Sequence, residues 1–257
     1  MITFASGETT AGSLPAGWKA EDFLSRDTLE ARARYVYDRT PNLVALLVDG
    51  PEAWVVKYFG WRHPLHFSFS PTFPSRAETS WKIARALLAA GVPTPEPIWT
   101  YTRRHRGFIF ENVLLTRAIH PHRSLRQILR EGNREHIPVL LDRLGTALAR
   151  MHRAGIQHRD LTTGNFLVAE DGSIYIVDLN RARRRRRLTV QERLEDLKKI
   201  HFPDQLSATI TAHFWTAYRD TSRLSVDWED QYRLMRARYR TRRRRRKQVQ
   251  ARLRKLR

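Results

Sequence analysis

Short runs of hydrophobic residues, separated by Gly, Pro and Asp, predict strands in the first half of the chain. Residues 42–48 and 53–59 flank the turn Asp49-Gly50-Pro51, and residues 98–102 and 108–119 flank the basic turn 103–107. One helix interrupts them at residues 75–90, with Ser75 as its cap and Gly91 just beyond its end. The pattern predicts a small antiparallel β-rich region with one helix.

The second half of the chain has mainly helical periodicity. Its best helix is Ile137–Arg153, where apolar residues recur on one face. Other helices are expected at residues 124–131, 191–200 and 204–220, and a hairpin at 166–168 and 174–177 around Asp171-Gly172. Residues 1–17 are small and polar, so we expect them to be loosely ordered.

Charge narrows the range of partners. Lys and Arg total 47 against 26 Asp and Glu, which gives a formal net charge of +21. Such a surface attracts polyanions, and nucleic acid, anionic lipid and phosphorylated glycan all qualify. The chain has no cysteine, which excludes disulfides and thiolate zinc sites. It has neither a long apolar run nor the features of a signal peptide, so we expect it to stay in the cytoplasm.

Five polar residues in and next to the predicted hairpin carry the chemistry. Asn165 enters the hairpin and Asp178 leaves it, so we expect their oxygens at the same open edge, where hard ligands suit Mg²⁺. Asp160 lies five positions before Asn165 and could accept a proton from an attacking hydroxyl. The stretch His158-Arg159-Asp160, followed by Asn165, matches the H-R-D-x-x-x-x-N pattern of protein-kinase-like phosphotransferases. The alternative is a basic surface loop whose acidic residues have no catalytic role.

Two residues of the first half complete the pattern. Lys57 interrupts the strand 53–59, where it could hold the phosphates of ATP and pair with Glu78 in the first turn of the helix 75–90. Each has an ordinary alternative. Lys57 could be a solvent-facing strand residue, and Glu78 an acid that complements the helix dipole.

With these residues the chain resembles the lipopolysaccharide core kinase family, which includes the bacterial heptose and Kdo kinases. The resemblance covers about residues 43–202. It is carried by SRAETSWKIARALLAAGVPTPEPI, FIFENVLLTRAI, HRDLTTGNFLV and IYIVDLNRARRRR. It implies an α+β, bilobal protein-kinase-like fold, with a small antiparallel β-rich N-lobe containing one helix and a mainly helical C-lobe. The expected division is a loose N-terminus (1–17), an N-lobe (18–118), a C-lobe (119–227) and a basic C-terminal helix or tail (228–257).

The resemblance also implies the roles of single residues. The reaction would move the γ-phosphate of ATP to a sugar hydroxyl of the lipopolysaccharide inner core. Asp160 would be the catalytic base, and the magnesium ligands would be Asn165 and Asp178. Lys57 would contact the phosphates, with Glu78 positioning it. The adenine edge would meet the backbone of residues 115–118, which include Leu115, Arg117 and Ala118.

Three features of the sequence depart from the kinase pattern. Residues 34–42 contain no glycine to form a phosphate-covering loop ahead of Lys57. In place of the usual D-F-G motif the chain has Asp178-Leu179-Asn180. The metal-binding acid is kept, but the phenylalanine and the glycine are replaced, which puts conformational switching in doubt more than the chemistry. No A-P-E motif follows, which argues against a protein kinase that docks peptides.

A basic run replaces the peptide-docking loop. Its guanidinium groups match the phosphates and carboxylates of an inner-core glycan, and an ordinary solvated face is the alternative. Asp196 in the next helix could buttress the catalytic loop or be a plain surface acid. The predicted acceptor-binding residues are Arg181, Arg183, Arg184 and Arg185, with Arg186 and Arg187 extending the run.

The C-terminal segment 228–257 is basic and helix-prone. We expect it to bind the inner face of the inner membrane, with a solvated tail and a nucleic-acid-binding arm as the alternatives. Three functions stay open: a lipopolysaccharide sugar kinase using ATP and Mg²⁺, a kinase for another small or macromolecular acceptor, and a non-catalytic kinase-like module that binds a polyanion.

Overall fold

The computed structural model describes residues 7–60, 74–131, 135–223 and 228–255. The chain forms two compact units. The first contains Met1–Arg123 and Leu167–Arg183, and the second contains Ser124–Phe166 and Arg184–Arg257. Both differ from the predicted lobes, because the hairpin that follows the catalytic loop groups with the first unit and not with the helical one.

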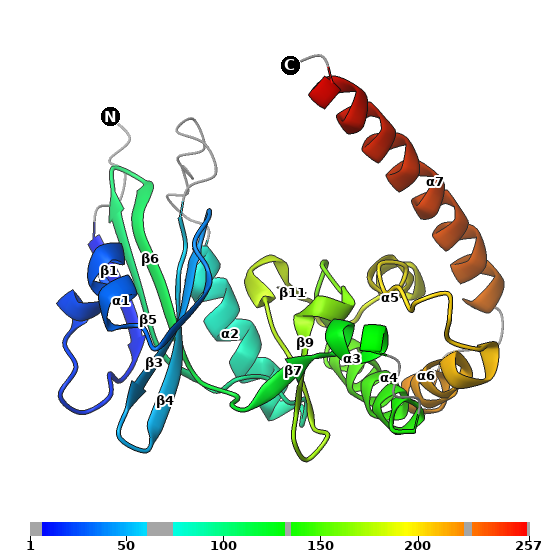
Figure 1. Ribbon diagram of the computed structural model, residues 1–257, viewed down its shortest axis with the longest axis horizontal. Coiled ribbons are helices and arrows are strands. Elements are labelled where there is room, and N and C mark those ends of the chain that lie inside the picture. The colour runs from blue at the N-terminus through cyan, green and yellow to red at the C-terminus, as the bar shows by residue number, and fades with distance from the viewer. Residues whose placement is uncertain (1–6, 61–73, 132–134, 224–227, 256–257) are drawn as a thin grey trace. The chain divides into compact units, whose positions relative to one another are not determined.

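A six-stranded antiparallel sheet forms the first unit, in the order β1-β5-β6-β4-β3-β2 (Figure 1). Alternate residues of its central strands fill a core with Phe23 and Leu29, which come from η1 (Ala20–Phe23) and α1 (Arg26–Arg32). The strands are β1 (Gly7–Gly12), β2 (Tyr35–Asp38), β3 (Leu43–Asp49), β4 (Glu52–Tyr58), β5 (Pro97–His105) and β6 (Phe108–Arg117).

The N-terminal prediction is wrong for part of its range. Residues 7–12, expected to be loose, form β1 and pair in register with β5 from Gly7 opposite Arg104 to Gly12 opposite Trp99. Small, polar residues suit this edge strand because it needs backbone pairing more than buried side chains. Residues 1–6 of the same prediction lie outside the described part. The sequence analysis predicted one helix in this region and missed α1, which precedes that helix along the chain.

Helix α2 (Arg76–Ala89) packs through Trp81 and Ala77 against Phe59 and Leu114. Its start is a capping box, in which the Ser75 hydroxyl accepts from the N–H of Glu78, and the Glu78 carboxylate accepts from the N–H of Ser75. Its predicted start and end are confirmed to within one residue.

The predicted hairpin is β9 (Phe166–Ala169) and β10 (Ile174–Ile176), and β7 (His122–Ser124) pairs with β9. The N–H of Ile176 donates to Pro93 O at 3.0 Å, and the Thr94 hydroxyl donates to Ile176 O at 2.7 Å. The proline-rich connector after α2 is therefore bonded to the hairpin. The short η3 (Leu179–Arg181) and β11 (Arg183–Arg184) follow.

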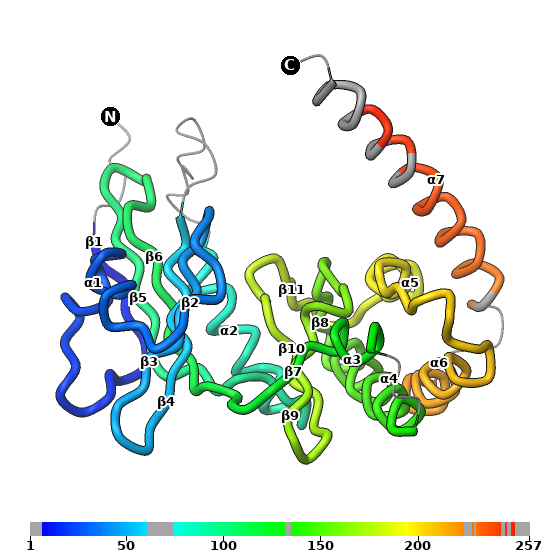
Figure 2. The backbone as a smooth tube through the Cα atoms, viewed as in Figure 1, coloured from blue at the N-terminus to red at the C-terminus, as the bar shows by residue number. Residues whose placement is uncertain are grey.

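Helices dominate the second unit (Figure 2). Tyr218 and Phe214 of α6 are fully buried, and Trp228 and Tyr232 of α7 extend this aromatic cluster. The elements are α3 (Leu125–Glu131), α4 (Ile137–Arg153), β8 (Ile156–Gln157), η2 (Thr163–Asn165), α5 (Val190–Leu197), α6 (Ala208–Ser222) and α7 (Trp228–Lys255).

The close contact of α4 with α6 depends on Gly145. A Cβ atom at this position would lie 2.4 Å from the backbone oxygen of Phe214. Gly145→Ala should therefore lower the free energy of unfolding by about 1–3 kcal/mol through overpacking. At an exposed helical site the same change would be stabilising. Thermal or denaturant unfolding measures this effect, with Arg150→Ala, at an exposed position of the same helix, as the control. A Gly145→Ala variant that is more stable than wild type would contradict the packing described.

Candidate active site

An ion pair between Lys57 and Asp178 forms the polar part of the site in the first unit. Lys57 Nζ lies 2.5 Å from Asp178 Oδ1, and Asn180 Nδ2 donates to the same oxygen at 2.6 Å. Asp178 adopts a left-handed backbone conformation, with φ of 65°. For a residue other than glycine this conformation is strained, and such strain is concentrated at functional sites. Asn180, in the place of the usual glycine, therefore holds the acid in position.

Glu78 does not pair with Lys57 in this structure, so the predicted ion pair is corrected. Its carboxylate accepts two hydrogen bonds from Arg104, at 2.7 and 3.1 Å, and also caps α2. The ordinary alternative, an acid at the helix N-terminus, describes its position better. The S-x-x-E spacing was the available signal, because an N3 glutamate in a capping box already has a partner.

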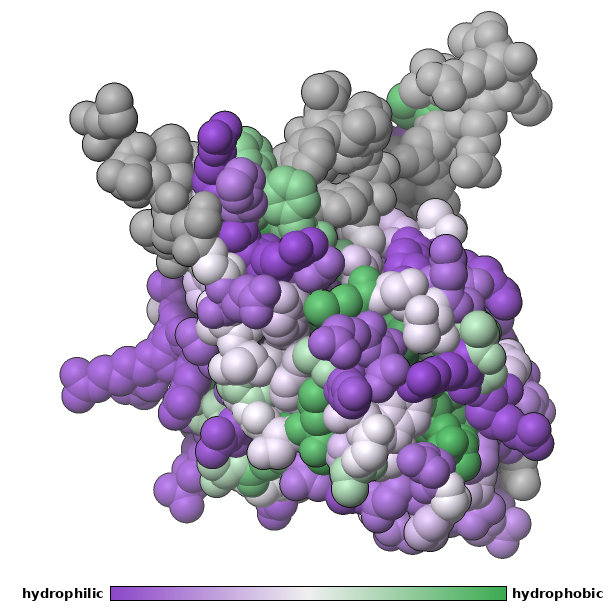
Figure 3. All heavy atoms as spheres, turned by 90° about the vertical axis from the view of Figure 1, so that its left-hand side faces the viewer, coloured by the Kyte–Doolittle hydropathy of each residue, from purple (hydrophilic) through white to green (hydrophobic). Residues whose placement is uncertain are grey.

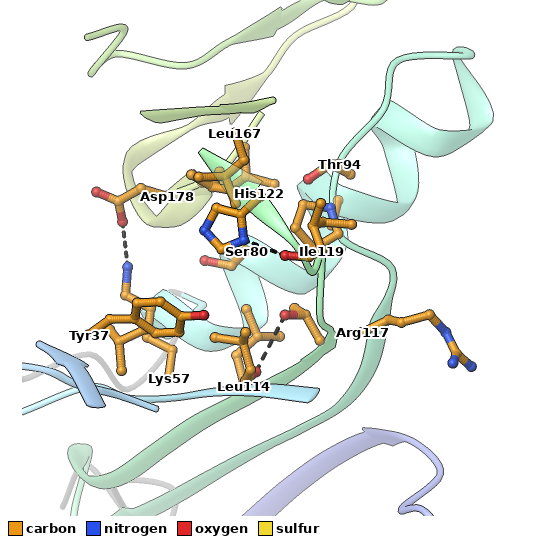
Figure 4. A pocket seen from close by; sticks show the side chains of 17 residues that line it. Tyr37, Lys57, Ser80, Thr94, Leu114, Arg117, Ile119, His122, Leu167 and Asp178 are labelled. Carbon is orange, nitrogen blue, oxygen red and sulfur yellow. Dashed lines mark hydrogen bonds and ion pairs between the residues drawn. The ribbon is translucent and has the colours of Figure 1, made fainter. Parts of the chain in front are cut away.

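A cavity of about 290 Å³ lies beside this pair, within the first unit (Figure 4). Its apolar lining includes Val44, Val55, Leu114 and Leu167, and Lys57 provides charge. A slot of this composition fits a flat, apolar heterocycle attached to a charged group.

The predicted nucleotide-binding residues are only partly placed on the cavity. Lys57 and Arg117 line it, whereas Leu115 is fully buried in the core behind the sheet. The N–H of Arg117 donates to Glu96 O and that of Ala118 to Ala53 O, so these donors are already used. Leu114 and Ile119 line the cavity instead.

The catalytic loop belongs to the second unit and is held by Asp196. This fully buried carboxylate accepts the backbone N–H groups of His158 and Arg159, both at 2.6 Å. His152 Nε2 lies 3.4 Å from it. The hypothesis that Asp196 buttresses the loop is therefore confirmed, and its alternative as a surface acid is wrong.

Within the loop, hydrogen bonds join the motif residues. The N–H of Asp160 donates to His158 Nδ1 at 3.2 Å, and Asn165 Nδ2 donates to Asp160 O at 2.8 Å. The amide nitrogen of Asn165 is thereby engaged, and its amide oxygen is the atom left to face a cation. The spacing H-R-D-x-x-x-x-N is what allows this local pairing.

Lys199 is a residue that the sequence analysis missed. It lies just after α5, donates to the backbone oxygen of Arg159, and places Nζ 3.7 Å from Asp160 Oδ1. Arg159 has a left-handed backbone, with φ of 67°. Asp196 and Lys199 thus hold the N–H and C=O of one strained residue. Their spacing of three was the only signal, and it is common on helices.

The donor set fits Mg²⁺ better than a metal that needs a full protein cage. The described residues contain no group of three or more His, Cys, Asp or Glu that could hold a metal. Magnesium instead uses one or two protein oxygens together with water and substrate phosphates. Asp178, in the first unit, and Asn165, in the second, offer such oxygens.

The basic run is exposed, as a substrate-binding surface requires. Arg185 is partly committed, because its Nε pairs with Glu192 at 3.1 Å and its N–H donates to Gly155 O. Arg183 and Arg184 form β11 with exposed side chains. Arg181, in η3, is exposed as well.

On the face of the first unit drawn in Figure 3, hydrophobic residues are scattered among hydrophilic ones.

Comparison with known proteins agrees with these features. Residues 62–221 match the profile described as the lipopolysaccharide kinase (Kdo/WaaP) family. A 3-deoxy-D-manno-octulosonic acid kinase of Vibrio vulnificus (strain CMCP6) is 29% identical over 116 residues, which are 45% of this chain and 48% of that protein. The Vibrio parahaemolyticus serotype O3:K6 (strain RIMD 2210633) protein of the same name is 26% identical over 158 residues, 57% of this chain and 65% of that protein. The chain thus spans about half to two thirds of these curated relatives.

The fold also has a solved counterpart. A structure of WaaP in complex with acyl carrier protein superimposes with a TM-score of 0.60 at 20% identity. The match covers 82% of this chain and 91% of that one. It confirms the predicted α+β fold of protein-kinase type, with a β-rich and a mainly helical lobe.

The Glu78–Arg104 pair makes stability depend on pH. Burial raises the pKa of Glu78, but the bonds from Arg104 and the Ser75 N–H outweigh it and leave the pKa below its ordinary 4.5. The stabilisation is therefore present above pH 4.5 and is lost as the pH falls through the lowered pKa. Glu78→Gln keeps the cap but loses the charge, so at pH 7 it should lower the free energy of unfolding by about 1–2 kcal/mol.

Denaturant unfolding at pH 7 and at pH 3 measures this difference. It should shrink as the pH falls through the lowered pKa of Glu78, because the wild-type carboxyl then becomes protonated. Glu52→Gln, which removes an exposed partner of Arg117, is the matched control and should change stability by less than about 0.5 kcal/mol. A Glu78→Gln deficit that is equally large at both pH values would contradict the role of the charge.

Proposed function

Because this chain belongs to the lipopolysaccharide kinase (Kdo/WaaP) family, we propose that it is an ATP-dependent kinase that phosphorylates a sugar hydroxyl of the lipopolysaccharide inner core, on heptose or Kdo. The single observation that carries the proposal is the catalytic loop, in which Asp160 and Asn165 are joined and Asp196 holds the backbone. This arrangement serves to position a carboxylate for proton transfer to it.

In the proposed reaction the acceptor hydroxyl oxygen forms a bond to the γ-phosphorus of ATP. The bond between that phosphorus and the β–γ bridging oxygen breaks, and ADP leaves. Asp160 accepts the hydroxyl proton. Lys57 contacts the phosphates, and Lys199 keeps the carboxylate of Asp160 oriented. Bound magnesium, with oxygens of Asn165 and Asp178 as its protein ligands, would neutralise phosphate charge.

The exposed arginines supply the proposed specificity for an anionic acceptor. The guanidinium groups of Arg181, Arg183 and Arg184 can each form two parallel hydrogen bonds to a phosphate or carboxylate. An inner-core glycan that carries both groups matches this chemistry. Arg185 contributes less, because Glu192 already neutralises it.

Asp160→Asn tests the proposed reaction. It should lower kcat for phosphate transfer from ATP to extracted core lipopolysaccharide by roughly 10²- to 10⁴-fold, because the proton acceptor is lost. Asp171→Asn, the same change in the turn of the hairpin, should leave kcat unchanged. Transfer is followed with labelled ATP. Equal transfer by wild type and Asp160→Asn would refute the role of Asp160, and transfer only to acceptors other than lipopolysaccharide would refute the proposed substrate.

Helix α7 supports a second proposal, that the protein binds the anionic inner face of the inner membrane. The first turns of α7 pack on the rest of the second unit, since Trp228 is buried and the Arg236 guanidinium group donates to Ile200 O. Farther along, Arg242, Arg245 and Val249 are exposed, and no acidic residue follows Asp230. None of the described helices combines the length and apolarity needed to cross a bilayer. A basic helix can instead lie on a negatively charged surface.

Vesicle binding tests the role of α7. Replacing Arg238, Arg242 and Arg245 by Gln should weaken binding to phosphatidylglycerol-containing vesicles roughly 100-fold, at about 1 kcal/mol per charge. The control replaces the exposed Arg85, Arg130 and Arg150 of α2, α3 and α4 by Gln, which gives the same net charge. Equal losses in both proteins would show that total charge, and not α7, is responsible. Binding to RNA but not to vesicles would favour the nucleic-acid alternative.

A further inference from the structure

Strand β2 presents Tyr37 to the cavity through an irregularity in its pairing. The register with β3 shifts between Val36 and Asp38, so Tyr37 is the extra residue of a β-bulge. Bulges redirect side chains, and they are common beside functional sites. Tyr37 lines the cavity. Its neighbour Tyr35 is 59% exposed and is not part of the lining.

The turn from β2 to β3, residues 39–42, follows Tyr37 and is bonded to its own surroundings. The N–H of Thr40 donates to Asp38 Oδ1 at 3.2 Å, and the proline at position 41 has no N–H. The guanidinium group of Arg26 donates to the backbone oxygens of Arg39 and Pro41. A glycine-rich loop would direct backbone groups to phosphates at this place, whereas these groups are used inside the protein.

Side-chain and backbone contacts fix the turn further. Arg39 pairs with Glu30 of α1 at 3.2 Å. Gly60 lies directly against the turn, because a Cβ atom on it would be 1.8 Å from Pro41 O. Arg76 of α2 donates to the oxygens of Asn42 and Gly60. The turn is thus tied to two helices, and Tyr37 is placed on a fixed support.

His122 lies opposite, on β7, and also lines the cavity. Its Nδ1 contacts the backbone oxygen of Ile119, so Nδ1 must carry the proton. This bond fixes the plane of the ring. The ring centroids of Tyr37 and His122 are 6.0 Å apart, with an angle of 41° between the planes. Figure 4 shows both rings facing the space next to Lys57 and Asp178.

We propose that Tyr37 and His122 form an aromatic lid that packs on the purine base of the nucleotide and takes the place of the glycine-rich loop. The inference rests on the proposed function. The rings are already within aromatic contact distance of each other, so they act as one cover and not as two plates around a base. The charged residues of the lining are Lys57, Asp178 and Arg117, and the rest of the lining is mainly apolar. In the proposed arrangement Lys57 contacts the phosphates, and the apolar part of the cavity and the lid hold the base.

With such a lid, the affinity for ATP includes a contribution from the base that tripolyphosphate lacks. Removing a ring that stacks on a base lowers affinity by roughly tenfold or more. Tyr37→Ala and His122→Ala should each raise the dissociation constant for ATP about tenfold, whereas Tyr37→Phe and His122→Phe keep a ring and should stay within about threefold. Binding of inorganic tripolyphosphate should be unchanged in all four variants.

Calorimetric titration of the full chain with ATP and with tripolyphosphate, both in the presence of Mg²⁺, measures these effects. Phe110→Ala is the control, because Phe110 is 43% exposed, much as Tyr37 is 41% exposed, and lies off the cavity. Thermal unfolding checks that each variant is folded. If wild type binds ATP and the alanine variants bind it equally well, the proposed lid is refuted, but the proposed function is not.

Two other outcomes are also decisive. Equal losses for ATP and tripolyphosphate would show that the segment acts on phosphates, as a glycine-rich loop does, and would overturn base packing. Wild type that binds no ATP would refute the proposed function, and the lid would be refuted with it.

Discussion

The catalytic loop depends on one buried carboxylate. Asp196 accepts the backbone N–H groups of two consecutive residues, His158 and Arg159, in a place where water does not reach. A buried charge is costly unless it is fully hydrogen-bonded, and here the loop backbone supplies the bonds. The same bonds hold Arg159 in a strained conformation, which sets the direction in which Asp160 leaves the backbone. Loop shape and charge burial are therefore satisfied together.

Local motifs of the site could be predicted from the sequence. The Asp160–Asn165 bond joins residues five apart, and the hairpin follows from Asp171-Gly172, so both are encoded within a few residues. The spacing of Ser75 and Glu78 likewise encodes the start of α2. Each of these features was available without knowledge of the rest of the chain.

Long-range pairings could not be predicted in the same way. Lys57 and Asp178 are 121 positions apart, and their contact depends on the register of β4 and on how the chain leaves β10. The capping spacing indicates that Glu78 already has one partner, but no local pattern shows that Arg104, on β5, is its second. The bulge at Tyr37 carries no sequence signal, since bulges depend on the pairing of two strands.

Arg104 has an effect beyond neutralising Glu78. It belongs to β5, which pairs with β6, and β6 pairs with the strand that carries Lys57. The N-terminus of α2 is thus fastened to the sheet by a largely buried ion pair, whose carboxylate also caps the helix. Moving this helix away from the sheet would separate two largely buried opposite charges, which is costly because neither charge would keep its partner. The position of α2 on the sheet is therefore held by electrostatic attraction as well as by apolar packing.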